Sequence, residues 1–397
     1  MAEKKSIVPL VILVIVFLII GFAGGYIIAG TQNHQSTKSI APLSVFAAGS
    51  LKYALGDNFK PTFENLTGIQ VGMTFSGSVG GAREVTAGTP YDVFISAAAG
   101  VIPQILMPNY TKWMVIFSSN EMAVTWTNSS YNIPSNQFWF ENISAPHIIV
   151  AASNASLDPS GFQAIEMIKL AGILYTNWSN PYVKEAFENN FSQFMVYNKA
   201  WNQWFGPNGQ LAKDNYGGNY PNNDSMALYD QLFQYKLKVG DLKLTTVEIG
   251  LDGYLQSGAA DYALTYKSQA INQGLNYYKN SKGGNGLPGW INLGSVNRSM
   301  VEFYTEVNSS GPSVDNIGNF PGGPILYSAT ILINTKNQAV ANQFIYYLIT
   351  SLGQSYLSSS EFDPIATPFL YGQGPSFLSG ITIPVPSYIP TSSYEEI

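Results

Sequence analysis

The sequence contains no cysteine and only two histidines, His34 and His147. Without cysteine, the chain has no disulfide scaffold, no thiolate metal site and no cysteine nucleophile. Two histidines are too few for a His-rich metal centre. A Ser-His-Asp hydrolase would need one of them beside a Gly-x-Ser-x-Gly turn, and neither has such a partner, so we expect no enzyme activity.

Charged residues are also scarce, at 11% of the 397 residues, against 46% hydrophobic and 14% aromatic. A chain this rich in apolar side chains is typical of a folded protein, and its length suffices for two buried cores. The net charge of −6 disfavours a nucleic-acid binder, because such a protein presents a basic face to phosphates.

The N-terminal segment predicts a membrane anchor. No side chain between residues 7 and 30 is charged, and this stretch exceeds the ~18 apolar residues that mark a transmembrane helix. A Lys-Lys pair precedes it, so the positive-inside rule places residues 1–6 in the cytoplasm and the remainder outside the cell. Small residues near Ala23 and Ala29 leave late cleavage open as the alternative. Residues 31–42 are polar and predict a tether.

A second sign of export is the density of Asn-x-Ser/Thr sequons. The sequons begin at Asn65, Asn109, Asn128, Asn142, Asn154, Asn177, Asn190, Asn223, Asn297 and Asn308. Chance predicts about five for this composition, so the excess indicates a glycosylated exterior. The alternative is that an Asn- and Ser-rich composition inflates the count.

The region after the tether alternates predicted strands and helices. The predicted strands are 43–48, 69–75, 91–99, 243–247, 261–265 and 325–334. The predicted helices start at Ser50 and after the Gly-rich turn at 77–81, and others lie at 161–172, 250–257 and around 340–348. This alternation predicts open parallel α/β sheets, whose ligands lie beyond the carboxyl ends of the strands. We expect 206–225 to be a surface insertion and the tail from Asp363 to be extended.

Two turns carry candidate binding groups, Gly49-Ser50-Leu51 and Gly77-Ser78-Val79. Each places a hydroxyl and free backbone N–H groups at a helix N-terminus, where the partial positive charge favours an anion. Serine is also a common N-cap, so either turn alone has an ordinary structural explanation. Two such turns after consecutive parallel strands point at the same crevice.

A third turn, Asp158-Pro159-Ser160, precedes a predicted helix. Asp158 can cap this helix with Pro159 at its first position, which is the ordinary reason for Asp-Pro before a helix. On these grounds alone we interpret Asp158 as a cap, and His147, which starts a predicted strand, as structural.

Six segments then carry a resemblance. They are AAGSL (47–51), FSGSVGGAREV (75–85), YDVFISAA (91–98), VIPQILMPNYTKWMVIFSSNEMAVTWT (101–127), SNASLDPSGFQAIEMIKLAG (153–172) and SGAADYALTYKSQAINQGLNY (257–277). In this order they resemble the tungstate/molybdate-binding proteins of archaeal ABC importers, over about residues 43–385. The segment 101–127 is the most specific, because neither helix capping nor turn chemistry requires it.

The resemblance implies a type II periplasmic-binding-protein fold, an α/β fold with two lobes and a ligand cleft, here preceded by the transmembrane helix. Lobe 1 would comprise 43–121 and 325–385, and lobe 2 would comprise 122–324 with the insertion. Residues 386–397 would form a C-terminal tail.

The resemblance also implies the site. The residues that would hold the oxyanion are Ser50, Ser78, Ser160 and Tyr266. Two carboxylates, Asp158 and Glu248, would reach the metal atom and raise its coordination from four oxygens to six. Where the family often has Cys and Arg near its Asp-Pro turn, this chain has Ser160 and Gln163, so we expect amide dipoles to hold the dianion.

The two carboxylates carry a physical argument of their own. In a sulfate pocket they would repel the dianion without compensation, because sulfur accepts no further oxygen ligands. Tungsten(VI) and molybdenum(VI) are hard centres that accept more oxygens, so the same carboxylates become ligands. Protonated phosphate remains a competitor, since a carboxylate can accept its P–OH hydrogen bond.

We therefore expect an extracellular solute-binding protein that captures tungstate or molybdate as its ligand, without a cofactor. The partners implied by the resemblance are an ABC permease and its ATPase, with the membrane reached through the N-terminal helix and no nucleic acid. Sulfate or phosphate binding by the same fold is one alternative. A glycosylated surface structural or adhesion protein without a ligand is the other. The sequence does not rank tungstate over molybdate.

Overall fold

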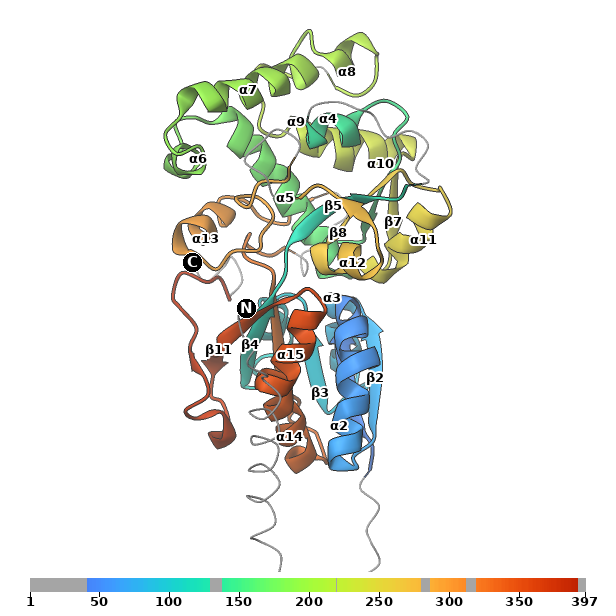
Figure 1. Ribbon diagram of the computed structural model, residues 1–397, viewed down its shortest axis with the longest axis vertical. Coiled ribbons are helices and arrows are strands. Elements are labelled where there is room, and N and C mark those ends of the chain that lie inside the picture. Colours follow the sequence, from blue (N-terminus) through green and yellow to red (C-terminus); the bar gives the residue numbers. More distant parts are fainter. Residues whose placement is uncertain (1–40, 129–137, 219, 280–285, 312–318, 392–397) are drawn as a thin grey trace, which may run out of the picture. The chain divides into compact units, whose positions relative to one another are not determined.

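The computed structural model describes residues 41–128, 138–218, 220–279, 286–311 and 319–391. Within these ranges, the strands form one seven-stranded and one five-stranded sheet (Figure 1). We call the seven-stranded sheet with its helices lobe 1, and the five-stranded sheet with its helices lobe 2. Both belong to a single unit that begins at Ala41.

The strands of lobe 1 are β1 (Leu43–Ala48), β2 (Val71–Ser76), β3 (Val93–Ser96), β4 (Trp113–Ser119), β10 (Leu326–Ile331), β11 (Asp363–Gly372) and β12 (Ile383–Pro384). Their order in the sheet is β12-β11-β4-β10-β3-β1-β2. β1 pairs in parallel with β2 and β3, whereas β10 runs antiparallel to β3 and β4. The carboxyl ends of β1, β2 and β3 therefore meet at one edge of the sheet.

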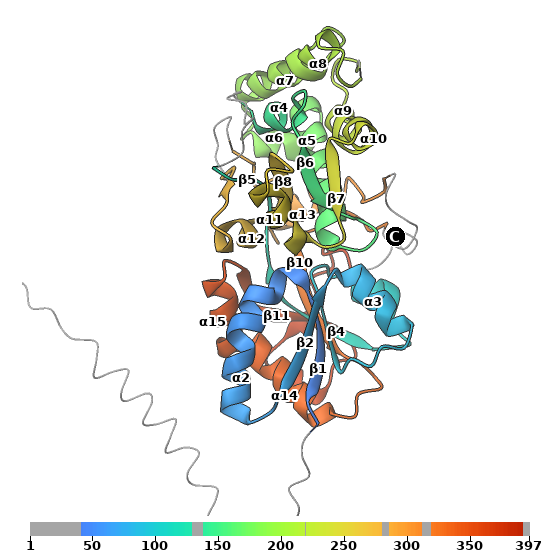
Figure 2. The ribbon, with the colours of Figure 1, turned by 90° about the vertical axis from the view of Figure 1, so that its right-hand side faces the viewer.

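The helical segments of lobe 1 are η1 (Gly49–Leu51), η2 (Lys52–Phe59), α2 (Lys60–Thr67), α3 (Ser78–Thr86), η3 (Ile102–Leu106), α14 (Gln338–Ile349), α15 (Ser351–Ser359) and η6 (Ser376–Leu378). Figure 2 shows α2 and α3 on opposite faces of the sheet. β2 and β3 flank β1 on different sides, so the crossovers from β1 to β2 and from β2 to β3 run in opposite directions across the sheet. Because both crossovers are right-handed, their helices lie on opposite faces.

The predicted helix after Ser50 is confirmed as the continuous run η1, η2 and α2. Leu51, Leu55 and Phe59, which share one face by their spacing, are fully buried. Burying each such side chain contributes roughly 1.5–3 kcal/mol, so this face holds the helix against the sheet. The serine at its start is thereby fixed beyond the end of β1.

The strands of lobe 2 are β5 (Met122–Trp126), β6 (Val150–Ser153), β7 (Leu242–Thr245), β8 (Tyr262–Tyr266) and β9 (Asn276–Tyr277). Their order is β7-β6-β8-β5-β9, and β6 pairs in parallel with β7 and β8. The carboxyl ends of β6, β7 and β8 meet at one edge, as those of β1, β2 and β3 do in lobe 1.

The helical segments of lobe 2 are α4 (Trp139–Ser144), α5 (Pro159–Thr176), α6 (Pro181–Ala186), α7 (Phe191–Phe205), α8 (Gln210–Lys213), α9 (Ala227–Tyr229), η4 (Asp230–Lys236), α10 (Leu237–Val239), η5 (Glu248–Gly250), α11 (Leu251–Gln256), α12 (Lys267–Asn272) and α13 (Arg298–Tyr304). The central helix α5 is buried along nearly its whole length. It begins at the Asp158-Pro159 turn, as its sequence predicts.

The two sheets are connected by short segments of chain. β4 of lobe 1 leads into β5 of lobe 2 through Asn120 and Glu121. The returning chain lies alongside, because Met122 N–H donates to the Asn292 carbonyl at 2.7 Å and Ile325 N–H donates to the Leu293 carbonyl at 2.8 Å. The chain thus crosses between the sheets at neighbouring positions.

Two predictions of surface structure agree only in part with the fold. The tail from Asp363 begins in extended form, but as β11, which is the second strand of the lobe 1 sheet and pairs with β4. The insertion 206–225 contains α8, and Leu211, Tyr216 and Tyr220 are buried. The Gly and Asn content of this segment predicts a surface loop, but these buried side chains anchor it to the rest of lobe 2.

The predictions for export are tested only in part. The predicted anchor 7–30 and most of the tether 31–42 lie outside the described residues, as does His34. In the part of the chain that is described, no helix is long and apolar enough to cross a bilayer. Among the sequons, Asn142 is only 4% exposed and donates to the Tyr278 hydroxyl at 2.8 Å, so the folded chain leaves no room for a glycan there.

Candidate functional site

The structure brings all six predicted site residues to the junction of the two lobes. From lobe 1 come Ser50 in η1 and Ser78 at the start of α3, and from lobe 2 come Asp158 and Ser160 at the start of α5, Glu248 in η5 and Tyr266 at the end of β8. None is more than 3% exposed. Each lies at or after the carboxyl end of a strand, which is the edge where α/β sheets bind ligands.

Ser50 is held by a polar network that the sequence did not indicate. Its hydroxyl lies 2.9 Å from the Tyr327 hydroxyl. Asn120, in the connection between the sheets, donates to the Tyr327 hydroxyl at 3.2 Å and to the Ser268 hydroxyl at 2.8 Å. Tyr327 belongs to lobe 1 and Ser268 to lobe 2, so Asn120 joins groups of both lobes beside Ser50.

Ser78 is fixed from within lobe 1. Its hydroxyl oxygen accepts a hydrogen bond of 3.0 Å from the backbone N–H of Ala97, which follows β3. Gly77 precedes α3 with extended backbone dihedrals, and the first N–H groups of α3 have no partner within the helix. This turn combines a positioned hydroxyl group with the N-terminus of a nine-residue helix.

Asp158 caps α5 and also contacts the turn that follows β7. One carboxylate oxygen accepts from the Ser160 N–H at 3.4 Å, and the other accepts from the Glu248 N–H at 2.7 Å. Burial raises the pKa of Asp158, while these hydrogen bonds act in the opposite direction. Its interpretation as a cap is confirmed, and the same carboxylate lies against Glu248.

Glu248 is buried beside Asp158 and faces lobe 1. A Cβ atom added at Gly49 would lie 2.9 Å from Glu248 Oε1, so the first turn of lobe 1 packs directly against this carboxyl group. Burial and the neighbouring charge of Asp158 raise the pKa of Glu248 well above its usual range. Both shifts therefore favour the protonated forms of the pair.

No cation pairs with these carboxyl groups within the described part of the chain; their hydrogen bonds and the causes of their pKa shifts involve only neutral or acidic groups. Nor do the described residues hold a cluster of three or more His, Cys, Asp or Glu that would bind a bare metal ion. When ionised, the pair thus needs a different electropositive partner.

Two buried polar atoms of this site lack hydrogen-bond partners, Ser160 Oγ and Glu248 Oε1. Leaving a buried polar atom unpaired costs about 1–3 kcal/mol. Because both atoms belong to residues at the junction, they fit a site that pairs them with a ligand.

Tyr266 is placed at the junction, but its phenol proton is engaged. The Tyr266 hydroxyl donates to Gln163 Oε1 at 2.7 Å, and Gln163 Nε2 donates across the junction to the Ala97 carbonyl at 3.3 Å. Burial, followed by the neighbouring Tyr327, raises the pKa of Tyr266 well above its usual range, so the phenol stays neutral. Gln163 therefore connects the two lobes.

Backbone atoms also meet across the junction. Gly80 N–H of α3 donates to the Leu157 carbonyl of lobe 2 at 3.0 Å. A Cβ added at Gly77 would lie 2.4 Å from the same carbonyl oxygen, well inside van der Waals contact. The two lobes are therefore in direct contact, and glycine at 77 is a condition of that contact.

His147 lies away from these residues. Its backbone is in the left-handed region, with φ 63°, and its ring centroid is 5.8 Å from that of Tyr216. The strand begins three residues later, at Val150, because the left-handed residue interrupts the extended chain.

The chain matches the family described as bacterial extracellular solute-binding protein over residues 43–362. The uncharacterized solute-binding protein Ta1052 of Thermoplasma acidophilum is 56% identical, over 98% of this chain and 98% of that protein. The molybdate/tungstate-binding protein WtpA of Pyrococcus abyssi is 27% identical, over 93% of this chain and 96% of that protein. A solved periplasmic molybdate-binding protein of Azotobacter vinelandii covers 81% of this chain and 98% of its own, with 14% identity and a TM-score of 0.45. The resemblance seen in the six sequence segments is confirmed.

Proposed function

We propose, from the premise that this chain belongs to the bacterial extracellular solute-binding protein family, that it captures tungstate or molybdate between its lobes. The observation that carries the proposal is the buried pair Asp158 and Glu248, which faces lobe 1 without a cation partner among the described residues. An electron-poor metal(VI) centre is the partner that such a pair fits.

The oxyanion oxygens would be held by dipoles. The turns at Ser50 and Ser78 supply hydroxyl groups from lobe 1, and the first turn of α5 supplies the Ser160 N–H and hydroxyl from lobe 2. Helix N-termini attract anions, and in a water-excluded site each such hydrogen bond is stronger than at a surface. Contacts from both lobes favour the arrangement in which the lobes touch.

Tyr266 has a positioning role in this proposal. Its hydroxyl holds Gln163, whose amide reaches the Ala97 carbonyl in lobe 1. The phenol thereby stabilises the contact between the lobes.

The carboxyl pair would also set selectivity. Sulfate offers no vacant coordination position to a carboxylate, so its negative charge adds to that of the pair and is repelled. Tungstate and molybdate accept the two carboxylate oxygens as ligands. Phosphate retains a proton that a carboxylate can accept, so it is the more serious competitor.

Isothermal titration calorimetry with tungstate, molybdate, sulfate and phosphate tests this function. We expect tungstate and molybdate to bind tightly and sulfate to be rejected. A ligand at one hundred times its Kd stabilises the fold by about 2.7 kcal/mol, so thermal unfolding provides an independent readout. Binding of sulfate or phosphate alone would assign the site to that oxyanion. No response to any of the four would favour a surface structural or adhesion role without a ligand.

The cellular setting is also part of the proposal. Residues 7–30 would anchor the chain in the membrane with 1–6 in the cytoplasm, and 31–42 would tether the two lobes outside the cell. Lobe 1 would comprise 43–121 and 325–385, lobe 2 would comprise 122–324, and 386–397 would form a tail. The ligand-bound form would deliver its oxyanion to an ABC permease driven by its ATPase. The protein would act as a carrier and not as an enzyme, and glycans would occupy exposed sequons.

A further inference from the structure

Asn120 lies where the chain crosses from β4 of lobe 1 to β5 of lobe 2, and it is only 1% exposed. Its amide oxygen accepts from the backbone N–H groups of Glu121 at 2.9 Å and Ser268 at 3.4 Å. The amide nitrogen is therefore the atom that faces the two neighbouring hydroxyl groups, those of Tyr327 at 3.2 Å and Ser268 at 2.8 Å. The surrounding groups thus fix the orientation of the amide.

The fixed amide determines how the Tyr327 hydroxyl bonds. Its oxygen accepts from Asn120, and a phenol has a single proton to donate. Within the described part of the chain, the acceptor for this proton is the Ser50 hydroxyl oxygen, 2.9 Å away. Burial raises the pKa of Tyr327, and the charges of Glu248 and Asp158 add to this, so the phenol keeps its proton. The hydrogen bonds therefore run in one direction, from Asn120 to Tyr327 to Ser50.

This direction leaves a donor at the end of the chain of hydrogen bonds. Because the Ser50 oxygen accepts from Tyr327, the Ser50 proton remains available to a ligand. Ser78 is prepared in the same way, since its hydroxyl oxygen accepts from the Ala97 N–H at 3.0 Å. An oxyanion without protons offers only acceptors, so it matches two serines that are both set to donate.

We propose that Asn120 is a positioning residue for oxyanion binding. By donating to Tyr327, it makes Tyr327 donate to Ser50 and so turns the Ser50 proton toward the ligand. Asn120 itself does not contact the oxyanion. This inference rests on the proposed function and adds to it a device that sets the polarity of one ligand contact.

Asn120→Asp tests the direction, because it reverses the bonds while keeping the shape of the side chain. An ionised carboxylate only accepts, so Tyr327 would donate to it, Ser50 would donate to Tyr327, and the Ser50 lone pairs would face the oxyanion. We expect calorimetry on the full chain in non-ionic detergent to show tungstate bound at least about 100-fold more weakly, through the lost donor and the added charge. In Tyr327→Phe the path to Ser50 is already cut, so the same change should cost only about tenfold, from the charge alone. Equal losses in the two backgrounds would overturn the proposal.

A second cycle introduces no charge and does not depend on the folding of Asn120→Asp. Tyr327→Phe should weaken tungstate binding about five- to tenfold in the unaltered chain, and less than about twofold once Ser50→Ala has removed the hydroxyl that it orients. Losses that add in full would show that Tyr327 does not act through Ser50, and would overturn the proposal.

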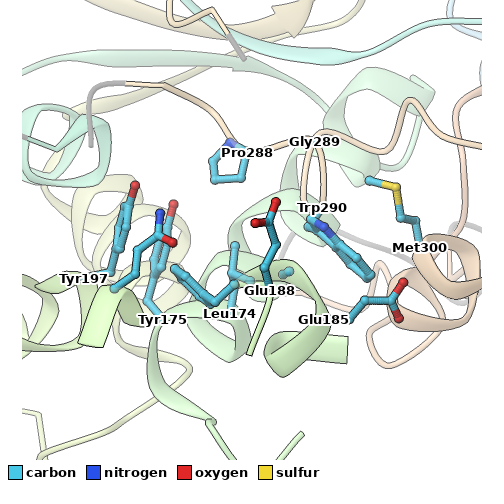
Figure 3. Close-up of a pocket in the computed structure, with 12 residues that line it drawn as sticks. Leu174, Tyr175, Glu185, Glu188, Tyr197, Pro288, Gly289, Trp290 and Met300 are labelled. Carbon is cyan, nitrogen blue, oxygen red and sulfur yellow. The ribbon is translucent and has the colours of Figure 1, made fainter. Parts of the chain in front are cut away.

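Two variants elsewhere in lobe 2 are matched controls. Asn142→Asp makes the same change at another buried asparagine that donates to a tyrosine hydroxyl, that of Tyr278 at 2.8 Å. Tyr175→Phe removes the hydroxyl of another fully buried tyrosine, which accepts from Trp139 Nε1 at 3.2 Å and lines the pocket at the end of α5 (Figure 3). Both should keep the tungstate affinity, and losses as large as those of the junction variants would overturn the proposal.

The unaltered chain separates this inference from the function on which it rests. If it binds neither tungstate nor molybdate, the proposed function fails and the role of Asn120 fails with it. If it binds tungstate while the losses in both cycles are additive, only the role of Asn120 is refuted.

Discussion

Replacing Gly77 by alanine should prevent the lobes from meeting while leaving each lobe folded. Gly77 has φ −64° and ψ 133°, which alanine adopts without strain. The added Cβ would lie 2.4 Å from the Leu157 oxygen and 3.1 Å from the Asp158 Cα. An ordinary contact begins near 3.4 Å, so relief requires the two backbones to separate by about 1 Å.

The size of the effect follows from this separation. Overpacking at a close contact costs about 1–3 kcal/mol. Moving apart also stretches the 3.0 Å hydrogen bond from Gly80 N–H to the Leu157 carbonyl, which contributes about 0.5–1.5 kcal/mol. Together these terms predict about 2–4 kcal/mol against the ligand-bound arrangement, or tungstate binding weakened by about 30- to 1,000-fold.

Calorimetry gives this affinity, and two alanine variants in the same helix serve as controls. A Cβ at Gly80 would lie 3.7 Å from the Leu157 oxygen, an ordinary contact, so Gly80→Ala should retain the affinity. A Cβ at Gly81 would lie 2.0 Å from the Phe46 ring inside lobe 1, so Gly81→Ala should lower the unfolding temperature of the ligand-free chain. If Gly77→Ala binds tungstate as tightly as the unaltered chain, contact between the lobes is not part of binding and the reasoning fails.

Three further predictions concern the junction. Glu248→Gln removes a proposed metal ligand and should weaken tungstate binding roughly 10- to 100-fold, because a charge-assisted contact contributes about 1.5–3 kcal/mol. Sulfate binding should stay the same or improve in this variant. Gln163→Leu leaves the Tyr266 hydroxyl unpaired and should destabilise the chain by about 1–3 kcal/mol in denaturant unfolding. Lowering the pH should stabilise the ligand-free chain, because burial raises the pKa values of Glu248 and of Glu166, a buried residue of α5, well above their ordinary value of 4.5. The stabilisation that these protonated groups contribute is complete below pH 4.5 and is lost as the pH rises through their folded-state pKa values. Tungstate affinity should instead fall as the pH is lowered, since protons compete with the metal for the carboxylates.

Each of these has a distinct contradicting result. Parallel losses of tungstate and sulfate affinity in Glu248→Gln would mean that the residue shapes the site and does not select the metal. If Gln163→Leu leaves the stability unchanged, the Gln163 amide does not stabilise the contact between the lobes. Gln193→Leu makes the same substitution at a half-buried glutamine of α7 and serves as the comparison. An unfolding temperature that falls from pH 7 to pH 5 would contradict the direction given for the buried carboxyl groups.

The elements predicted from local patterns agree with the structure. The spacing of Leu51, Leu55 and Phe59 identified a buried helical face, because period and burial are both local properties of the chain. The Asp158-Pro159 turn identified the start of α5 for the same reason, since a cap bonds residues within its own turn. The role of Glu248 came only from resemblance, and its binding of a metal stays a prediction.

Contacts between distant segments could not be predicted in this way. Asn120 and Ser268 are 148 residues apart, and Ser50 and Tyr327 are 277 apart. Nothing near Gly77 in sequence indicates that its missing side chain admits the Leu157 carbonyl, because that carbonyl belongs to the other lobe. β11 likewise joins the sheet by pairing with β4, whereas the Pro and Ser content of the whole tail from Asp363 predicted only an extended segment on the surface.

X-ray absorption at the tungsten edge of the tungstate-bound chain tests the central idea most directly, because it counts the oxygen atoms around the metal. We predict about six oxygen neighbours in the unaltered chain, including two longer ones from Asp158 and Glu248, and a smaller number in Glu248→Ala. Four equal oxygen neighbours, unchanged in Glu248→Ala, would show that the carboxyl groups do not bind the metal and would contradict the account.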